Sequence, residues 1–247
     1  MTTILVTRPE GQADHLIAAL EQAGYYCLHR PLMAIEAVAE HSEHARLARA
    51  RMLDLDLYQH VIAISANAAR SGLEWLDTYW PQPPLGVHWY GVGPASTEPF
   101  WQYGLEASCP ASRYDSEGLL ALPALQQVAE QRILIWRGVG GRETLATTLR
   151  ARGACVDYAE LYERRPRQYS SHDWDVTLGT RPWLLLSSGQ ALDIIERQVP
   201  TLANRIAGLI LPSERIAEQA RAKGYDPVLV PASARDDDML SCLAAQL

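Results

Sequence analysis

The chain has 247 residues, of which 48% are hydrophobic and 21% are charged. These values are typical of globular protein, and the length allows two domains that each bury their own core. The formal net charge is −7, and the densest basic cluster is only "ERRPRQ" at 163–168, so we expect no nucleic-acid partner. The apolar runs are too short to cross a membrane and the N-terminus lacks the pattern of a signal peptide, so we expect a cytoplasmic protein without a membrane partner.

The cysteines and histidines show no metal-ligand spacing. Cys27, Cys109, Cys155 and Cys242 lie far apart, and no CxxC or HExxH motif occurs. Reduced thiols are therefore expected rather than disulfides or a zinc site. The sequence predicts neither a metal nor any other cofactor.

Short apolar runs alternate with helical patterns along the chain. We expect strands at Thr3–Val6, Val61–Ser65, His88–Val92, Arg132–Trp136, Trp183–Ser187 and Gly208–Leu211, each followed by a helix. Four of the helices are expected to end at Gly24, Gly104, Gly153 and Gly224. Such alternation indicates parallel sheets with crossover helices.

Two extended segments, 31–40 and 159–168, each follow the strand after a first helix and read as linkers leaving a domain. If both are linkers, residues 1–36 and 173–247 form one discontinuous domain, and residues 37–172 form the other together with its linker strands. We expect the linkers to lie side by side and a ligand to bind in a crevice between the domains. The six strand–helix units also fall into two similar sets of three, with Arg8 and Arg137 after the first strand and Ser65 and Ser187 after the second.

The ends of the predicted strands carry small residues and arginines. In parallel sheets ligands bind at the carboxyl ends of the strands, where helix N-termini present free N–H groups that suit anions. The residues concerned are Arg8, Ser65, Asn67, Ser96, Arg137, Gly138, Gly140, Gly141, Ser187, Ser188 and Ser213. Each serine, taken singly, is equally well explained as a helix cap, and only the occurrence of so many together favours an anion site.

The turn "GVGGRE" at 138–143 is not a nucleotide-binding motif of a common kind. It lacks the third glycine of GxGxxG, where Glu143 stands, and it lacks the lysine of a P-loop. An anion-facing turn assisted by Arg137 or Arg142 fits better, although Arg142 could instead face solvent or pair near Glu143. The acidic run "RDDDML" at 235–240 is read as the start of a C-terminal helix, where negative charge is favourable.

The chain resembles the uroporphyrinogen-III synthase family. The resemblance is carried, in order, by "LVTRPEGQADHLIAALEQAG", "ISANA", "GVGPAS", "DSEGLL", "RGVGGRETLATTLRARGACVDYAELYERR" and "PSERIAEQARAKG". It implies two flavodoxin-like parallel-sheet α/β domains joined by a two-stranded linker, and no cofactor. The implied reaction removes the terminal hydroxyl of hydroxymethylbilane as water, inverts the last pyrrole ring through a spiro intermediate and closes the macrocycle. The implied product is uroporphyrinogen III, a precursor of haem.

The resemblance also implies site residues. Substrate-binding positions would be Arg8, Ser65, Ala66, Asn67, Ser96, Arg137, Gly138, Gly140, Gly141, Ser187, Ser188 and Ser213. Tyr162 in "LYERR" matches the position that the family associates with catalysis, whereas Tyr158 competes for that role and a tyrosine that only packs a linker strand is the alternative. The substrate carries eight carboxylates, so a chain at −7 must bind it through local groups rather than long-range attraction.

The rival interpretation is a non-catalytic two-domain sensor for a polyanionic small molecule, because no nucleophile–base pair stands out in the sequence. If the protein is an enzyme of this family, its expected partner is the linear tetrapyrrole substrate. A transient contact with the enzyme that makes hydroxymethylbilane is also possible. A monomer is expected.

Overall fold

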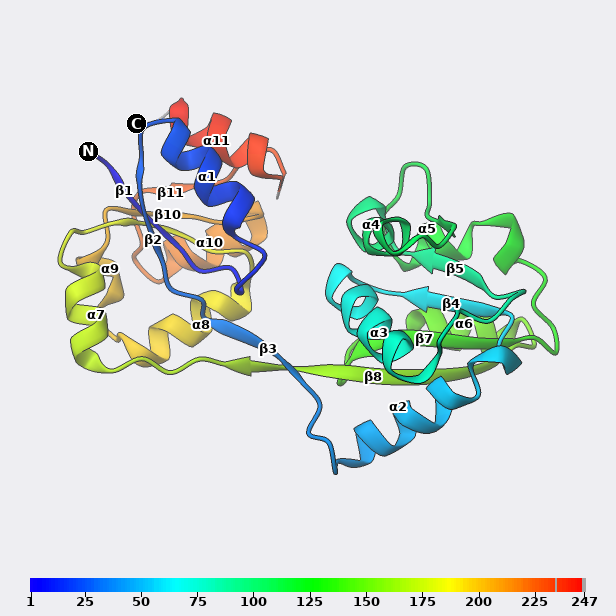
Figure 1. Ribbon diagram of the computed structural model, residues 1–247. Coiled ribbons are helices and arrows are strands. Elements are labelled where there is room, and N and C mark those ends of the chain that lie inside the picture. Colours follow the sequence, from blue (N-terminus) through cyan, green and yellow to red (C-terminus); the bar gives the residue numbers. More distant parts are fainter. Residues whose placement is uncertain (234, 246–247) are drawn as a thin grey trace. The chain divides into compact units, whose positions relative to one another are not determined.

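The computed structural model describes residues 1–233 and 235–245. The chain divides into unit 1, Met1–Ala34 with Arg165–Leu247, and unit 2, Ile35–Arg164. It passes between the units in β3 (Met33–Ala37) and at the end of β8 (Cys155–Pro166), which are neighbours in one sheet (Figure 1). The backbone N–H of Val38 donates to the carbonyl of Leu161 at 3.3 Å, so the two connecting segments are hydrogen-bonded to each other.

The second passage lies earlier in the chain than the boundary expected at residue 173. Helix α7 (Ser171–Leu178) begins with a capping box between Ser170 and Asp173, which fixes the helix start on the unit 1 side. Trp174 and Leu178 of this helix are buried in the core of unit 1. The segment 159–168, expected to be an extended linker, lies largely in β8, and the chain joins the core of unit 1 at α7.

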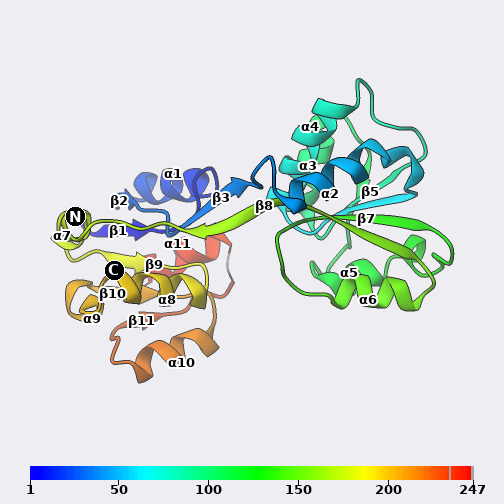
Figure 2. The ribbon, with the colours of Figure 1, turned by 90° about the horizontal axis from the view of Figure 1, so that it is seen from below.

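Unit 1 contains a parallel five-stranded sheet in the order β11-β10-β9-β1-β2. The strands are β1 (Thr3–Val6), β2 (Tyr26–His29), β9 (Trp183–Leu185), β10 (Gly208–Ile210) and β11 (Val228–Leu229). Ile4 and Val6 pack under α1 (Asp14–Gln22) and α11 (Asp236–Ala244) on one face. Leu5 points to the other face, which is covered by α7, α8 (Gly189–Gln198), α9 (Leu202–Arg205) and α10 (Glu214–Ala222) (Figure 2). Alternate strand residues thus feed two cores, as expected for a sheet buried on both sides.

Unit 2 is built in the same way. Its sheet has the order β3-β8-β7-β4-β5-β6, and β4 (His60–Ala63), β5 (His88–Gly91), β6 (Ala107–Ser108) and β7 (Arg132–Gly138) run parallel to one another and to β8. One face is covered by α2 (Glu43–Leu53), α3 (Ala66–Tyr79) and α4 (Pro94–Tyr103), and the other by α5 (Ser116–Leu120) and α6 (Thr144–Ala151). Short 3₁₀ turns lie at Leu55–Leu57 and Pro123–Leu125.

The two sheets share one spatial strand order. If each sheet is followed from β2 or β8, the sequence of strands is β2-β1-β9-β10-β11 in unit 1 and β8-β7-β4-β5-β6 in unit 2. Both correspond to the flavodoxin-like order when the count begins at β1 and at β7. The expected fold class, two parallel α/β domains, is confirmed. In unit 1 Arg8 follows β1 and Ser187 follows the neighbouring β9, whereas in unit 2 Arg137 lies within β7, next to its last residue, and Ser65 follows the neighbouring β4.

All six strands expected from the sequence are present, although several end one or two residues earlier than expected. The four glycines expected to end helices, Gly24, Gly104, Gly153 and Gly224, have φ between 87° and 91°. This left-handed conformation is the reason for glycine at those positions.

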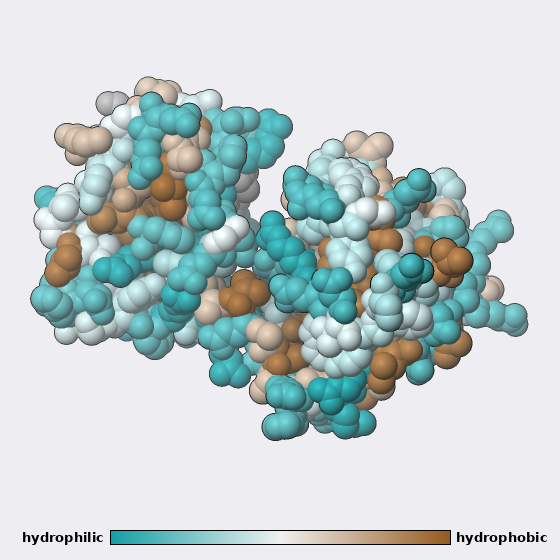
Figure 3. Space-filling view, viewed as in Figure 1, coloured by the Kyte–Doolittle hydropathy of each residue, from teal (hydrophilic) through white to brown (hydrophobic). Residues whose placement is uncertain are grey.

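On the face shown in Figure 3 hydrophilic residues cover most of the area, and hydrophobic ones are scattered in small groups. Within 1–233 and 235–245, none of the helices combines the length and the apolar character that crossing a membrane requires.

Candidate functional site

Each sheet gathers several predicted site residues at the carboxyl ends of its strands. In unit 1, Arg8, Ser187 and Ser213 follow the adjacent strands β1, β9 and β10. In unit 2, Ser65 follows β4, and Gly138 ends the neighbouring β7. Because adjacent strands are parallel, these residues lie at one edge of their own sheet.

Arg137 ties down the glycine-rich turn of unit 2. Its side chain is 2% exposed, and Nη1 lies 2.9 Å from Oε1 of Glu143. Nε donates to the carbonyl of Gly138 at 3.3 Å, and Nη2 donates to the carbonyl of Gly140. On the other side of the turn, Glu160 accepts a hydrogen bond from the N–H of Gly140 at 3.0 Å. The guanidinium predicted to bind substrate is thus engaged by the turn itself.

The glycines of this turn are required for two different reasons. Gly140 and Gly141 have φ of 74° and 111°, a conformation that residues with a side chain rarely adopt. Gly138 leaves room for the ring of Tyr162, since a Cβ at this position would lie 2.6 Å from Cε2 of that ring. The turn therefore reverses sharply and packs directly on Tyr162.

Tyr158 and Glu143 complete the support of the turn. The Tyr158 hydroxyl donates to Glu143, and the guanidinium of Arg137 lies 4.5 Å from the centre of the Tyr158 ring. The hydrogen bond from Tyr158 lowers the pKa of Glu143, partial burial opposes this, and Arg137 adds to the lowering. Burial and the same hydrogen bond raise the pKa of Tyr158. Glu143 therefore stays ionised and Tyr158 neutral at neutral pH.

Tyr162 and Ser65, two of the predicted site residues, contact each other. The Tyr162 hydroxyl lies 3.1 Å from Oγ of Ser65, and the Tyr162 side chain is 1% exposed. Ser65 is partly exposed and caps α3, because its Oγ accepts the N–H of Ala68 at 3.1 Å. Its own proton remains available to Tyr162 or to a ligand. Ala66 and Asn67 follow in the first turn of α3.

The remaining predicted serines differ in their surroundings. Ser188 caps α8 by accepting the N–H of Ala191 at 3.2 Å, and Ser213 holds the same position before α10 without a side-chain cap. Ser187 is exposed, whereas Ser96 is 4% exposed inside the first turn of α4, whose cap is Gly93. Ser96 thus belongs to the interior of unit 2, and Ser187 belongs to the surface of unit 1.

Arg8 is held by the C-terminal helix. Its Nη1 lies 2.7 Å from Oδ1 of Asp236, and Nη2 lies 3.4 Å from Sδ of Met239. Burial alone would raise the pKa of Asp236, but hydrogen bonds from His15 and Arg8 outweigh it and lower that pKa. The acidic run does begin a helix, as its sequence indicated, and its first carboxylate also pairs with a predicted ligand of the substrate.

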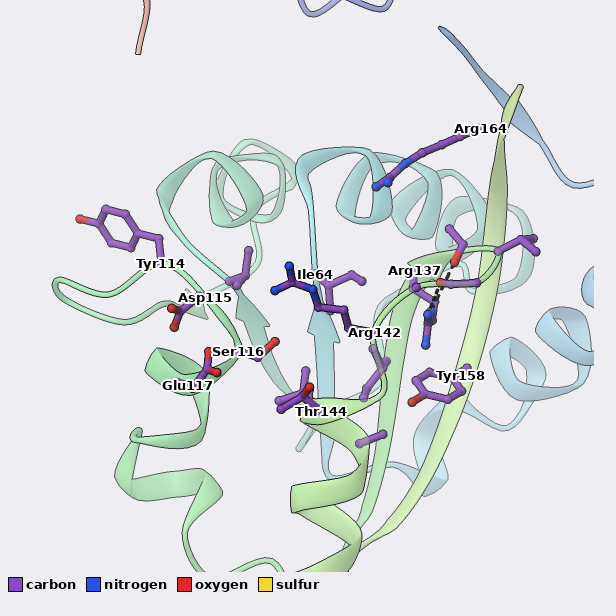
Figure 4. Close-up of a pocket in the computed structure, with 18 of the residues that line it drawn as sticks. Ile64, Tyr114, Asp115, Ser116, Glu117, Arg137, Arg142, Thr144, Tyr158 and Arg164 are labelled. Carbon is purple, nitrogen blue, oxygen red and sulfur yellow. Dashed lines mark hydrogen bonds between the residues drawn. The ribbon is translucent and has the colours of Figure 1, made fainter. Parts of the chain in front are cut away.

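Unit 2 contains a cavity of about 590 Å³ beside the glycine-rich turn (Figure 4). The turn and β7 line one side, the segment around Asp115 at the start of α5 lines another, and Ile64 and Val92 contribute apolar side chains to the lining. Arg142 projects from the turn across this cavity, and Arg164 reaches toward it from β8.

Sequence reasoning did not single out Arg113, Asp115 or Arg164 of this cavity, although "DSEGLL" pointed to the segment that holds Asp115. Arg142 lies between two glycines with positive φ, Gly140 and Gly141, and α6, which begins at Thr144.

Among the described residues there is no group of three or more His, Cys, Asp or Glu side chains that could hold a metal ion. The chemistry that the arrangement offers is instead hydrogen bonding by hydroxyls and helix-start N–H groups, with two arginines facing the cavity of unit 2.

The variant Ser188→Ala should lower the free energy of unfolding by about 1 kcal/mol, because it removes the cap of α8. Ser187→Ala is the matched control, since this neighbouring side chain is exposed and caps nothing. Urea unfolding of both variants measures the difference. Equal stability of the two would show that the Ser188 hydroxyl does not cap the helix in solution.

Known proteins are similar to this chain both in fold and in sequence. The family model described as "Uroporphyrinogen-III synthase HemD" matches residues 14–241. Uroporphyrinogen-III synthase of Salmonella typhimurium is 32% identical over 252 residues, covering 98% of this chain and 99% of that protein. The Proteus mirabilis uroporphyrinogen-III synthase is 37% identical over 176 residues, covering 70% of this chain and 85% of that protein.

Solved structures share the fold at low sequence identity. Uroporphyrinogen-III synthetase from Helicobacter pylori superposes with a TM-score of 0.63 at 12% identity, covering 100% of both chains. A mutant uroporphyrinogen III synthase from Thermus thermophilus gives 0.60 at 16% identity, covering 99% of this chain and 98% of that one. Since the family model and the full-length relatives span nearly the whole sequence, the chain belongs to the uroporphyrinogen-III synthase family.

Proposed function

We propose that the protein converts hydroxymethylbilane to uroporphyrinogen III, with loss of water and inversion of the terminal pyrrole ring. The observation that carries this is the family match across residues 14–241. The strand-end hydroxyls, helix starts and cavity-facing arginines agree with a substrate of this kind, because it bears eight carboxylates.

Binding is proposed to use helix-start N–H groups more than charged side chains. Arg8 and Arg137 already pair with Asp236 and Glu143 within the protein. The first turns of α3, α8 and α10 carry backbone N–H groups that lack partners within the helix and attract carboxylates. The proposed substrate-binding set is unchanged: Arg8, Ser65, Ala66, Asn67, Ser96, Arg137, Gly138, Gly140, Gly141, Ser187, Ser188 and Ser213. Of these, Arg8, Ser96 and Arg137 are proposed to hold neighbouring residues in place instead of contacting the substrate themselves.

Ser65 and Tyr162 are proposed to assist the loss of the substrate's hydroxyl. The C–O bond breaks as the pyrrole nitrogen supplies electrons, and the departing oxygen takes a proton to leave as water. Ser65 is partly exposed and can donate to that oxygen, while the buried Tyr162 hydroxyl, 3.1 Å behind it, donates to Ser65 in turn. Tyr162 thereby acts through Ser65 rather than by touching the substrate.

After water has left, no group of the protein needs to bond covalently to the substrate. Ring inversion and closure require that the two ends of the tetrapyrrole be held together, which is an entropic task for the binding surface. This is consistent with the absence of a nucleophile–base pair in the sequence.

The alternative, a non-catalytic sensor, is not favoured by the family. The two differ in stoichiometry, since a sensor binds a ligand once, whereas an enzyme consumes many equivalents. Purified protein at a concentration far below that of enzymatically made hydroxymethylbilane should form uroporphyrinogen III in large molar excess over itself. Product that never exceeds the amount of protein would contradict the proposal.

Activity should survive exhaustive chelation and dialysis, because the cysteine and histidine spacings offer no metal site. The measurement is the rate of uroporphyrinogen III formation before and after treatment. A loss of activity that one added metal restores would contradict the expectation.

The expected cytoplasmic monomer and the transient contact with the enzyme that makes hydroxymethylbilane stay predictions. Light scattering of the purified protein alone, and mixed with that enzyme, would measure both the oligomeric state and the contact.

A further inference from the structure

The cavity of unit 2 is positively charged within a chain whose net charge is −7. Four arginines line it, Arg113, Arg137, Arg142 and Arg164, together with two acidic residues, Asp115 and Glu117. A local excess of positive charge in an acidic protein is a feature that the general composition does not explain.

Two of these arginines are occupied by acidic neighbours. Arg137 pairs with Glu143 at 2.9 Å and hydrogen-bonds the turn carbonyls. Arg113 pairs with Asp115 at 2.7 Å and with Glu117 at 3.5 Å. Both acidic residues of the lining therefore pair with Arg113, whose single positive charge balances one of the two carboxylates.

Arg142 and Arg164 are not occupied in this way. Both are exposed, and neither side chain makes an ion pair or a hydrogen bond with any residue among 1–233 and 235–245. Arg164 lies over the ring of Tyr162, 6.0 Å from its centre. Arg142 extends from the glycine-rich turn into the middle of the cavity in Figure 4.

The base of Arg142 is well anchored although its guanidinium is unpaired. The turn before it is fixed through Arg137 and through the bond from the Gly140 N–H to Glu160. The residue after it, Glu143, is held by Tyr158 and Arg137. A long side chain on a fixed backbone loses less conformational freedom on binding than one on a mobile loop.

We propose that Arg142, assisted by Arg164, binds a carboxylate side chain of the tetrapyrrole in this cavity. This rests on the proposed function for the identity of the ligand, and it adds a side-chain ligand to the backbone groups proposed above. A guanidinium presents two parallel N–H donors that match a carboxylate, which a helix start does not. An arginine in the cavity would also help an acidic protein to bind a ligand with eight negative charges. The attraction between the guanidinium and one carboxylate acts over a short distance, where salt screens it little.

The test compares Arg142→Gln with Arg70→Gln, which removes the same charge from an exposed arginine of α3 that forms no ion pair within the described part of the chain. Steady-state kinetics with hydroxymethylbilane and fluorescence titration with uroporphyrin, an octacarboxylate, are measured on both variants and the parent. We expect Arg142→Gln to raise KM and the uroporphyrin Kd about tenfold with kcat changed less than about twofold, and Arg70→Gln to change none of them. Arg142→Lys should recover part of the affinity, because it keeps the charge without the forked geometry.

Unchanged KM and Kd in Arg142→Gln would overturn the inference, as would a fall in kcat alone or an equal effect of Arg70→Gln. Failure of the proposed function looks different, since the parent protein would then form no uroporphyrinogen III. In that case the uroporphyrin Kd of Arg142→Gln, compared with that of the parent, still tests whether Arg142 binds a carboxylate. A parent protein that does not bind uroporphyrin would also overturn the inference.

Discussion

The variant Tyr162→Phe is expected to turn over hydroxymethylbilane roughly 10- to 100-fold more slowly, which corresponds to about 1.4–2.7 kcal/mol of barrier. The change removes the hydroxyl that lies 3.1 Å from Oγ of Ser65. The effect should be limited, because the pyrrole nitrogen supplies much of the push that expels water. KM should change little, since the Tyr162 side chain is only 1% exposed and offers no surface to the substrate.

Tyr58→Phe is the matched control for this variant. Tyr58 is also buried in unit 2, and its hydroxyl donates to Asp157 at 2.9 Å. Both variants should lose about 1 kcal/mol of stability with the hydrogen bond, but only Tyr162→Phe should slow turnover. Tyr158→Phe would be a less clean control, because Tyr158 supports Glu143 and Arg137.

The coupling between Tyr162 and Ser65 can be measured separately. If the two hydroxyls act in series, adding Ser65→Ala to Tyr162→Phe should lower kcat little further.

The product of Tyr162→Phe should remain the type III isomer, because ring inversion depends on how the substrate is held. Full activity of Tyr162→Phe would remove the residue from the mechanism.

Gly138→Ala is expected to lower turnover at least about tenfold and to destabilise the protein by about 1–3 kcal/mol. The added Cβ would lie 2.6 Å from Cε2 and 2.8 Å from Cζ of Tyr162, so the buried ring or the turn must move. Either movement disturbs the hydroxyl pair with Ser65 or the carbonyl that Arg137 binds.

Gly189→Ala provides the comparison for this substitution. Gly189 likewise lies near the carboxyl end of a strand, at the start of α8, but a Cβ there would meet its nearest neighbour, Ile216, at an ordinary 3.7 Å. Kinetics and urea unfolding of both variants measure the two effects. A Gly138→Ala protein with the turnover and stability of Gly189→Ala would contradict the packing of Tyr162 against the turn.

The sequence predicted the parts of the fold that depend on local pattern. Strands such as Thr3–Val6 and helix ends such as Gly24 follow from apolar periodicity and backbone preference, both of which are written in a few neighbouring residues. The boundary at 173 was less accurate, because the side of the connection on which Trp174 is buried depends on packing against residues far away in the chain.

The sequence was also a poor guide to which arginine of the site is available to a ligand. Arg137 stood where an anion ligand was expected, but it is engaged by Glu143 and by the turn carbonyls, and Glu160 of the adjacent strand supports the same turn. Arg142 was the weaker candidate by sequence, yet its side chain faces the cavity. Which arginine keeps an unpaired charge depends on how the turn folds back onto Arg137, and on Tyr158 and Glu160, which β8 brings beside the turn. The second contribution comes from another strand, so the sequence of the turn alone does not contain it.

The central claim, that this protein directs the closure of hydroxymethylbilane, is tested most directly by the isomer ratio of the product. Hydroxymethylbilane left alone loses its hydroxyl without help and closes without inverting the last ring, which gives the type I isomer. We predict that adding the purified, chelator-treated protein makes type III the dominant product, as separated and quantified by chromatography. A ratio of type I to type III that stays unchanged at every protein concentration would contradict the account.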